Sequence, residues 1–271
     1  MLSLDLKGKI VFVSGGAGDI GSQIVDSFVK QGCETIIGDM DEKNAKDLTT
    51  KYPGRRVSAC VLDITSEESV REAGKFVETH YNNLDILVNV AGILCRKAFF
   101  ETSKEDFDKS FAVNVTGMFL VSKVMSEIMK RRKSGTIVNI SSLNGRAAIE
   151  NRIVYGATKS AVNMLTQSMA LELAPFNITV NAVAPGVVDS NMSRVRLNTP
   201  ELRQEFASVI PLKRLATPQD VADCVLFLSS PYASYITGEI ILVDGGIIAR
   251  QSLPGPLFKQ EETFMGKDRN R

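Results

Sequence analysis

Residues 10–21 read IVFVSGGAGDIG, a short apolar run that leads directly into a glycine-rich turn. Apolar residues at helical spacing follow over residues 20–31, so the order is strand, glycine turn and helix. Backbone N–H groups at the start of such a helix can hold a pyrophosphate, and glycines allow it to approach closely. A glycine cluster alone also fits a tight turn, so the surrounding sequence has to decide.

Six further apolar runs rich in β-branched residues alternate with helical patterns along the chain. They are nearly continuously apolar, which indicates strands covered on both faces, as in a parallel sheet between helices. We expect a single α/β domain of 271 residues with a Rossmann fold, a doubly wound parallel sheet of about seven strands flanked by helices. The predicted strands are 10–14, 35–38, 57–61, 86–89, 136–141, 178–184 and 240–243, and the main predicted helices are 20–31, 66–81, 104–133 and 154–173.

Two segments depart from this alternation. Residues 190–215 mix apolar and charged residues and contain Pro200 and Pro211, which predicts a mobile helical excursion that forms a lid over the substrate. The tail, residues 247–271, contains further prolines and a charged end. We expect the tail to be loosely packed or bound in an interface.

Charge and composition exclude several classes of protein. The chain has 32 Lys and Arg against 31 Asp and Glu, so it has no net field of the kind that nucleic-acid binders use. Its 4 cysteines are widely spaced and His80 is its only histidine, so we expect no disulfide framework, metal site or Ser-His-Asp triad. We also expect no membrane span and no secretory leader, and therefore a cytoplasmic location.

Asp39 follows the second predicted strand, at the distance from Gly21 at which dinucleotide-binding folds carry an acidic residue. A carboxylate there can accept hydrogen bonds from the adenosine ribose hydroxyls and would repel the 2′-phosphate of NADP. No Arg or Lys in the glycine turn or directly after the strand offsets this charge, which favours NAD as the cofactor. The alternative is that Asp39 or Asp41 caps the next helix.

Several motifs in order resemble the short-chain dehydrogenase/reductase family, from Leu6 to about Gly246. The glycine turn is similar to the family's Thr-Gly-x-x-x-Gly-x-Gly, and residues 89–92, NVAG, look like its Asn-Asn-Ala-Gly. The remaining matches in family order are Asp63, Asn114, Ser142, Tyr155, Lys159, Pro185 and Gly186.

The resemblance implies cofactor contacts along one end of the sheet. Asp63 corresponds to the family's adenine-contacting acid, and Ser190 to the residue that binds the nicotinamide carboxamide, which is more often Thr. The full set of implied contacts is Ser14, Gly15, Asp19, Ile20, Gly21, Asp39, Met40, Asp63, Ile64, Asn89, Ala91, Gly92, Tyr155, Lys159, Pro185, Gly186, Val188 and Ser190.

The glycine turn departs from the family pattern at two positions. Ser14 replaces Thr, which is a mild change, whereas Asp19 stands where the family's middle glycine approaches the pyrophosphate. A carboxylate would repel the phosphates there unless it turns outward or caps the helix. We expect weakened NAD binding, which the substitution Asp19→Gly should tighten.

A catalytic set can be assembled from four residues. Removing a hydride from an alcohol carbon requires a base for the hydroxyl proton, and tyrosine, with a pKa of ~10, is a poor base unless a cation favours tyrosinate. Lys159 lies one helical turn from Tyr155 and supplies that cation. Ser142 ends a predicted strand and can donate a hydrogen bond to the substrate oxygen. By resemblance, Asn114 holds a water next to the lysine.

By resemblance, five arginines stand where the family builds its substrate pocket. Arg96 follows residues 89–92, Arg146 and Arg152 lie between Ser142 and Tyr155, and Arg194 and Arg196 lie in the segment 190–215. Because guanidinium groups suit carboxylate, sulfonate and phosphate, we expect a small anionic or polyhydroxylated substrate such as a sugar acid, sugar, polyol or hydroxy-sulfonate. Each arginine could equally be a solvated surface residue. The predicted substrate contacts are Arg96, Ser142, Asn144, Arg152 and Tyr155.

Three functions remain open from the sequence. The first is an NAD-dependent oxidoreductase that transfers a hydride to or from an alcohol or ketone. The second is a ketoreductase of the 3-oxoacyl-carrier type, which Asp39 disfavours because such enzymes usually use NADPH. The third is a non-catalytic binding protein, which Asp19 allows but the complete catalytic set disfavours.

The resemblance also implies a homotetramer. The helices predicted over residues 104–133 and 154–173, and the strand at 240–243, would form its interfaces. Apolar residues in the first of these helices fit an interface or the protein core equally well. They are Val121, Val124, Met125 and Ile128.

Overall fold

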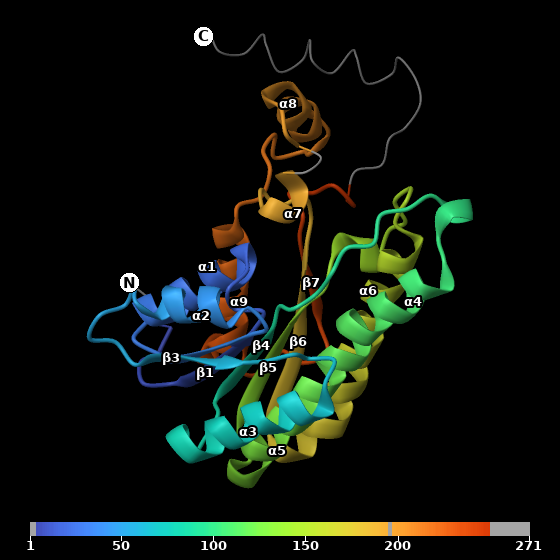
Figure 1. Cartoon of the computed structure of the whole chain (residues 1–271). Coiled ribbons are helices and arrows are strands. Elements are labelled where there is room, and N and C mark those ends of the chain that lie inside the picture. Colours follow the sequence, from blue (N-terminus) through green and yellow to red (C-terminus); the bar gives the residue numbers. More distant parts are fainter. Residues whose placement is uncertain (1–3, 195–196, 250–271) are drawn as a thin grey trace, which may run out of the picture.

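A sheet of seven parallel strands forms the centre of the molecule, in the order β3-β2-β1-β4-β5-β6-β7 (Figure 1). The structure, a computed structural model, describes residues 4–194 and 197–249. The strand order reverses between β1 and β4, which confirms the predicted doubly wound sheet. The strands are β1 (Ile10–Ser14), β2 (Glu34–Asp39), β3 (Val57–Val61), β4 (Ile86–Asn89), β5 (Gly135–Ile140), β6 (Ile178–Pro185) and β7 (Ile240–Val243).

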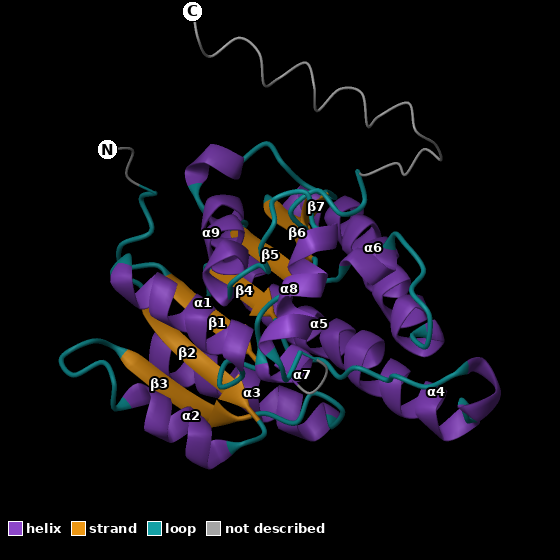
Figure 2. Cartoon of the chain, turned by 90° about the horizontal axis from the view of Figure 1, so that it is seen from above, coloured by secondary structure: helices purple, strands orange, loops and turns teal. Residues whose placement is uncertain are grey.

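Helices cover both faces of this sheet (Figure 2). Each face has its own core cluster, one around Phe28 and Ile37 and the other around Phe12 and Leu87. Burial on both faces explains why the strands are almost entirely apolar. The first face carries α1 (Asp19–Lys30), α2 (Glu42–Thr49) and α9 (Pro218–Ser229), and the second carries α3 (Glu67–Tyr81), α5 (Met118–Arg132) and α6 (Ile153–Leu173).

Two of these helices, α2 and α9, were given no bounds from the sequence, although a helix after Asp41 was considered there. In α2 the buried residues are only Ala45 and Leu48, too short a stripe for helical periodicity to stand out. The start of α9 carried a readable signal, because Thr217 and Asp220 form a capping box around a proline at the first helical position.

The segment predicted as one helix over residues 104–133 contains a π-helical turn, Ala112–Gly117, between α4 (Lys104–Phe111) and α5. By length and composition alone, the 29-residue helical run Lys104–Arg132 could cross a membrane, which the sequence analysis did not anticipate. In the fold its apolar face is buried in the core that covers one face of the sheet. The four residues considered for an interface belong to that core: Val121, Met125 and Ile128 are buried, and Val124 packs partly buried against them.

Between β6 and α9 the chain leaves the sheet, as predicted for residues 190–215. Two helices, α7 (Asn191–Arg194) and α8 (Pro200–Val209), lie beyond the carboxyl ends of the strands (Figure 1). The Thr199 side chain caps α8 by accepting a hydrogen bond from the Leu202 N–H. We refer to residues 186–216 as the excursion. Most of the predicted tail, residues 250–271, lies outside the described residues.

Candidate active site

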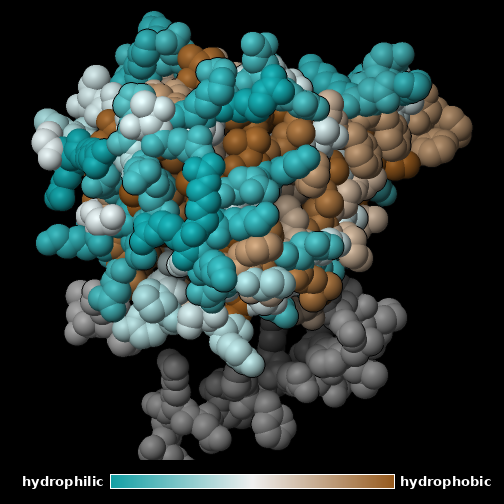
Figure 3. All heavy atoms as spheres, turned by 90° about the horizontal axis from the view of Figure 1, so that it is seen from below, coloured by the Kyte–Doolittle hydropathy of each residue, from teal (hydrophilic) through white to brown (hydrophobic). Residues whose placement is uncertain are grey.

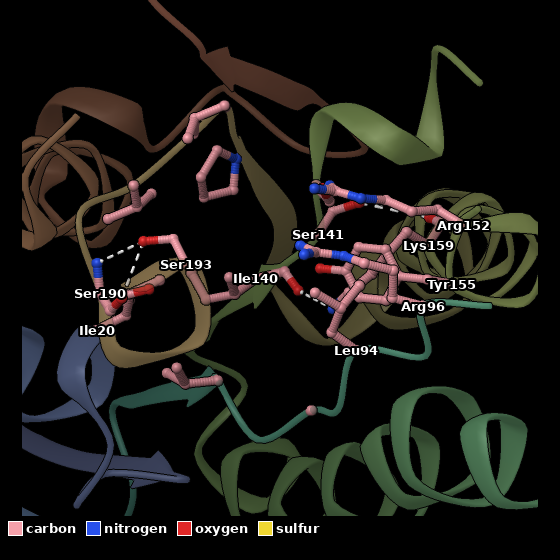
Figure 4. A pocket seen from close by; sticks show the side chains of 17 residues that line it. Ile20, Leu94, Arg96, Ile140, Ser141, Arg152, Tyr155, Lys159, Ser190 and Ser193 are labelled. Atoms are coloured by element: carbon pink, nitrogen blue, oxygen red, sulfur yellow. Dashed lines mark hydrogen bonds between the residues drawn. The ribbon is translucent and has the colours of Figure 1, made fainter. Parts of the chain in front are cut away.

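A cavity opens at the carboxyl ends of the strands, next to the point where the strand order reverses. In doubly wound sheets this is where ligands bind. The predicted site residues that line it are Ile20, Gly92, Arg96, Ser142, Arg152, Tyr155, Lys159, Pro185, Gly186, Val188 and Ser190. Figure 4 shows Arg96, Arg152, Tyr155 and Lys159 on one side of the cavity, and Ile20, Ser190 and Ser193 on the other.

The glycine turn at the end of β1 has little room for side chains on its inner face. Gly15 has φ +67°, and a Cβ there would lie 2.7 Å from the backbone of Ala91. A Cβ on Gly21 would lie 2.1 Å from the carbonyl oxygen of Gly15. A Cβ on Gly18 would lie 3.5 Å from its nearest neighbour, the carbonyl oxygen of Gly15, so the outer side of the turn is open. This open cradle at the start of α1 fits a dinucleotide pyrophosphate.

The Asp39 carboxylate links the end of β2 to the glycine turn. One oxygen accepts a hydrogen bond from the Ala17 N–H at 2.9 Å, and the other accepts one from the Asp41 N–H at 3.0 Å. The cap of α2 is the Asp41 side chain, which accepts from the Asn44 N–H at 3.0 Å. Asp39 is therefore free of the capping role and holds its negative charge beside the open turn.

Asp19 does not cap α1, because the N-cap is Gly18 and Asp19 is the first helical residue. Its carboxylate instead accepts two hydrogen bonds from Asn191, one from the backbone N–H and one from Nδ2 at 2.8 Å. Asp19 is therefore not a helix cap. Its carboxylate is turned toward Asn191 in another segment.

Other predicted cofactor residues hold the strand ends together. The Asn89 Nδ2 group donates to Ser122 Oγ and to Asn139 Oδ1, both at 2.9 Å, and Ser14 Oγ donates to Asn89 Oδ1 at 3.4 Å. These contacts are buried, so Asn89 and Ser14 fix the spacing of β1, β4 and β5.

The three predicted residues at the adenosine end of the site have different surroundings. Asp63 accepts hydrogen bonds from the Thr65 N–H at 2.9 Å and from Thr65 Oγ1 at 2.7 Å, both on one carboxylate oxygen. The Met40 side chain is exposed, whereas Ile64 is buried. None of the three lines the cavity described above.

Tyr155 and Lys159 lie one turn apart in α6. The Lys159 Nζ donates to the carbonyl oxygen of Ile140 at 2.8 Å and lies 5.8 Å from the centroid of the Tyr155 ring. Burial lowers the pKa of Lys159 to about 8. Burial also raises the pKa of Tyr155, opposed by a hydrogen bond with the Ser142 side chain and by the charge of Arg152.

Asn114 lies in the π-helical turn and is buried. Its Oδ1 accepts from the Ile93 N–H at 2.7 Å, and its Nδ2 donates to the Ile93 carbonyl at 2.9 Å and to Thr158 Oγ1 at 3.1 Å. Asn114 therefore ties the segment after β4 to the helix that carries Tyr155 and Lys159. Wide helical turns of this kind often occur at functional sites.

Arg96 and Arg152 come from separate segments and line the same cavity. The Lys97 N–H donates to the Asn151 carbonyl at 3.1 Å, and Lys97 and Arg152 form a short parallel β-bridge. The two segments are thus paired through their backbones, which brings both guanidinium groups to the side of the cavity that holds Tyr155.

Asn144 does not line this cavity, although it was predicted to contact the substrate. It is buried, and its Oδ1 accepts a hydrogen bond from Arg152 Nη1 at 2.8 Å. Its backbone N–H donates to Ser142 Oγ at 3.2 Å. Asn144 therefore contacts both a predicted catalytic residue and a predicted substrate residue.

The other arginines considered for the pocket do not line it. Arg146 Nη2 donates to the Ile240 carbonyl at 3.1 Å, and Arg194 binds Asp189 and Asn191. Arg196 lies outside the described residues.

Comparison with known proteins identifies the family to which this chain belongs. A family model described as "Enoyl-(Acyl carrier protein) reductase" matches residues 15–248. The 3-oxoacyl-[acyl-carrier-protein] reductase FabG of Aquifex aeolicus is 38% identical over 250 residues, which cover 91% of this chain and 100% of that protein. The chain belongs to the short-chain dehydrogenase/reductase family. It is accordingly an oxidoreductase that acts on hydroxyl or keto groups.

Other members of the short-chain dehydrogenase/reductase family differ in substrate and cofactor. An NAD-dependent glycerol dehydrogenase of Listeria innocua is 32% identical and covers 88% of this chain and 93% of its own length. A candidate gluconate dehydrogenase of Agrobacterium tumefaciens has a TM-score of 0.89 at 30% identity, covering 93% of this chain and 100% of that one. A gluconate 5-dehydrogenase of Burkholderia cenocepacia, in complex with NADP and tartrate, has a TM-score of 0.86 at 26% identity, covering 92% and 98%.

Ser193, which lines the cavity, and Asn191, which precedes it in α7, were not singled out from the sequence. Ser193 lines the cavity, donates to the Ser190 carbonyl at 2.9 Å and accepts from the Ser190 N–H at 3.0 Å. The Ser-x-x-Ser spacing at the start of a short helix was its only signal. Asn191 had no signal at all, because its partner Asp19 is 172 residues away in the chain.

Proposed function

We propose that this short-chain dehydrogenase/reductase is an NAD-dependent enzyme acting on a small hydroxy or keto compound that carries an anionic group. The observation that carries the proposal is that Arg96 and Arg152 line the same cavity as Ser142 and Tyr155. Guanidinium groups bind carboxylate, sulfonate and phosphate oxygens in a fixed, planar geometry. An anionic group bound there would place a neighbouring carbinol carbon near the tyrosine hydroxyl.

The catalytic residues of this chain divide the work of proton transfer. The chemistry that a bound nicotinamide supplies is the acceptance or donation of a hydride. Tyr155 takes the hydroxyl proton in oxidation and returns it in reduction, while Ser142 donates a hydrogen bond to the same oxygen. Burial raises the pKa of Tyr155, and a hydrogen bond with Ser142 and the charge of Arg152 lower it. We expect the ammonium group of Lys159, 5.8 Å from the centroid of the tyrosine ring, to favour the tyrosinate form as well.

Asp39 supports NAD over NADP. Its carboxylate is held between Ala17 and Asp41 beside the glycine turn, where it can accept hydrogen bonds from the ribose and repel a 2′-phosphate. The NAD-dependent glycerol dehydrogenase among the relatives agrees with this choice, whereas the gluconate 5-dehydrogenase complex holds NADP. Comparison of kcat/KM with NAD and NADP tests it directly. A preference for NADP would contradict the assignment.

Within the anionic and polyhydroxylated compounds we favour sugar acids, followed by sugars, polyols and hydroxy-sulfonates. Two structural relatives are described as gluconate dehydrogenases, and one of them holds tartrate, a dicarboxylate with two hydroxyl groups. Both ligand chemistries suit a cavity with two guanidinium groups beside a tyrosine.

A second candidate is reduction of a 3-oxoacyl group on an acyl carrier. The identity of 38% with a FabG protein favours it. Asp39 argues against it if such reductases use NADPH, and a pair of arginines beside the tyrosine offers an uncharged acyl chain no specific partner. Turnover of a 3-oxoacyl thioester with NADPH, but not of sugar acids with NAD, would establish this alternative.

The decisive experiment measures absorbance at 340 nm with NAD or NADP against sugar acids, sugars, polyols, hydroxy-sulfonates and neutral alcohols. The variant Arg152→Ala should raise KM for anionic substrates about tenfold to a hundredfold and leave KM for neutral alcohols little changed, while kcat falls for both because the charge of Arg152 also lowers the pKa of Tyr155. Arg146→Ala is the matched control, because its guanidinium binds the Ile240 carbonyl and does not line the cavity. An equal rise in KM for anionic and neutral substrates in Arg152→Ala would contradict the anion site.

We also propose a homotetramer located in the cytoplasm. Phe99 and Phe100 lie just before α4 and Phe107 lies within it, and all three are exposed. Figure 3 shows tan, apolar side chains on a protruding part of the molecule. The 4 cysteines are free thiols, which fits a reducing compartment. Light scattering should give four times the chain mass of 29.6 kDa, and a monomer would contradict the tetramer. Fractionation of the native host tests the location.

A further inference from the structure

Asp19 and Asn191 join two segments on the same side of the cavity. Asp19 is the first residue of α1 and Asn191 the first of α7. Both oxygens of the Asp19 carboxylate accept hydrogen bonds from Asn191, one from its backbone N–H and one from Nδ2 at 2.8 Å. Their chain neighbours Ile20 and Ser190 line the cavity side by side (Figure 4).

The contact continues into the rest of the excursion. Asn191 Oδ1 accepts from Arg194 Nη1 at 3.2 Å, and Arg194 Nε donates to Asp189 at 3.4 Å. Asp189 in turn accepts two hydrogen bonds from Arg203 on α8, at 2.7 and 2.8 Å. One polar network thus runs from the glycine turn through α7 to α8, and Asp19 is its only member on the glycine turn among the described contacts.

We propose that Asp19 and Asn191 form a clasp that holds α7 against the glycine turn and slows the release of the dinucleotide. Ser190 and Ser193, on either side of Asn191, belong to the cavity wall, so opening the clasp loosens that wall. The carboxylate at position 19 then acts as a positioning group. Two hydrogen-bond donors bind its carboxylate. On this proposal Asp19 slows the release of the dinucleotide, which is the opposite of the weakened NAD binding expected from the sequence.

The first test measures NADH release by stopped-flow fluorescence in the whole chain. Asp19→Gly removes both hydrogen bonds and should release NADH about tenfold faster than wild type, whereas Asn191→Ala removes only the side-chain bond and should release it about threefold faster. The double variant should be no faster than Asp19→Gly, since a contact can be lost only once. Slower release from Asp19→Gly with wild-type release from Asn191→Ala would overturn the clasp and restore the repulsion hypothesis.

A second test needs no cofactor. Trypsin can cut the excursion after Arg194 and Arg203, so limited proteolysis of the cofactor-free chain, followed by mass spectrometry, reports how often α7 opens. Both variants should be cut there faster than wild type. The matched control is Asp26→Ala, which removes another acid of α1 that pairs with Lys30 at 2.6 Å, away from the excursion. Equal cutting in all four proteins would contradict the clasp.

The two tests separate this inference from the cofactor assignment. If the wild-type chain binds NADPH and not NADH, the assignment of NAD fails, and the release experiment is repeated with NADPH. The proteolysis result stands in either case, because it is measured without any nucleotide.

Discussion

The catalytic wall and the excursion lie on opposite sides of one cavity and are held in different ways. By catalytic wall we mean the proposed catalytic residues Ser142, Tyr155, Lys159 and Asn114, on or next to β5, α6 and the π-helical turn. Asn114 and Lys159 are only 2% and 5% exposed. Asn114 binds the backbone carbonyl of Ile93, in the segment after β4, and Lys159 binds that of Ile140, at the end of β5. Their positions are therefore set by the fold itself.

Water reaches the polar contacts that hold the excursion, although Leu197 and Ile210 of this segment are buried. The Asp189 and Arg203 side chains are each about one third exposed, and Arg194 is more exposed still. Exposed ion pairs contribute little stability and are screened by salt. On the proposed function, the difference teaches that proton transfer takes place where buried contacts fix the side chains, whereas the opposite wall of the cavity depends in part on exposed ion pairs.

The largest effect should come from the catalytic wall. Tyr155→Phe removes the proton acceptor and keeps the ring, so kcat should fall roughly a thousandfold while NADH binding and thermal unfolding remain close to wild type. Steady-state kinetics at 340 nm measure kcat, and NADH fluorescence measures NADH binding. Tyr232→Phe, at a tyrosine 50% exposed on the surface, is the matched control. A wild-type rate in Tyr155→Phe would remove the proposed mechanism.

A second prediction uses the buried charge of Lys159. Its folded pKa is lowered from 10.5 to about 8, so between these values the unfolded chain holds a proton that the folded chain has released. Wild-type stability should therefore rise with pH across this window, relative to Lys159→Met, by about 3 kcal/mol in total. Below pH of about 8 the cost of burying the ammonium is fully present. Urea unfolding of both proteins at several pH values measures the difference in their free energies of unfolding. If the two free energies changed in parallel with pH, burial would not shift the pKa of Lys159.

Asn144 links the wall to substrate selection, and its effect should be smaller. Asn144→Ala removes the acceptor for Arg152 Nη1 and should raise KM for anionic substrates about tenfold, with kcat changed less. Asn144→Asp should raise KM further, because a carboxylate there competes with the substrate for the guanidinium. The backbone N–H to Ser142 survives both changes. If neutral alcohols lose as much as anionic substrates, Asn144 acts on catalysis and not on specificity.

The smallest effect should come from the excursion. Arg203→Ala removes two hydrogen bonds to Asp189, whose pKa lies below its ordinary value because of the hydrogen bonds from Arg203 and Arg194. Since the pair is exposed, we expect the free energy of unfolding to change by less than about 1 kcal/mol, while NADH release becomes about twofold to threefold faster. The wild-type release rate should also rise with salt, and the variant should lose part of that dependence. If kcat of Arg203→Ala fell as far as that of Tyr155→Phe, the proposed difference in role between the two regions would be wrong.

Much of the fold could be predicted because its signals are local. The strands are apolar runs of 4 to 8 residues, and their order in an α/β alternation leads to a doubly wound sheet. The helix boundaries were harder where the buried stripe was short, as in α2, or where the backbone widened without a sequence mark, as in Ala112–Gly117. Helical periodicity does not distinguish a π-helical turn from a regular one.

The sequence by itself determined the parallel sheet, the glycine turn and the one-turn spacing of Tyr155 and Lys159, because each depends on residues close together in the chain. Only the tertiary structure decided that Arg152 binds Asn144 and that Asp19 binds Asn191. Such contacts depend on the direction of side chains from separate segments, which spacing along the chain does not encode. The physical reason is that local periodicity sets which face a residue occupies, whereas packing of distant segments sets which partner it meets there.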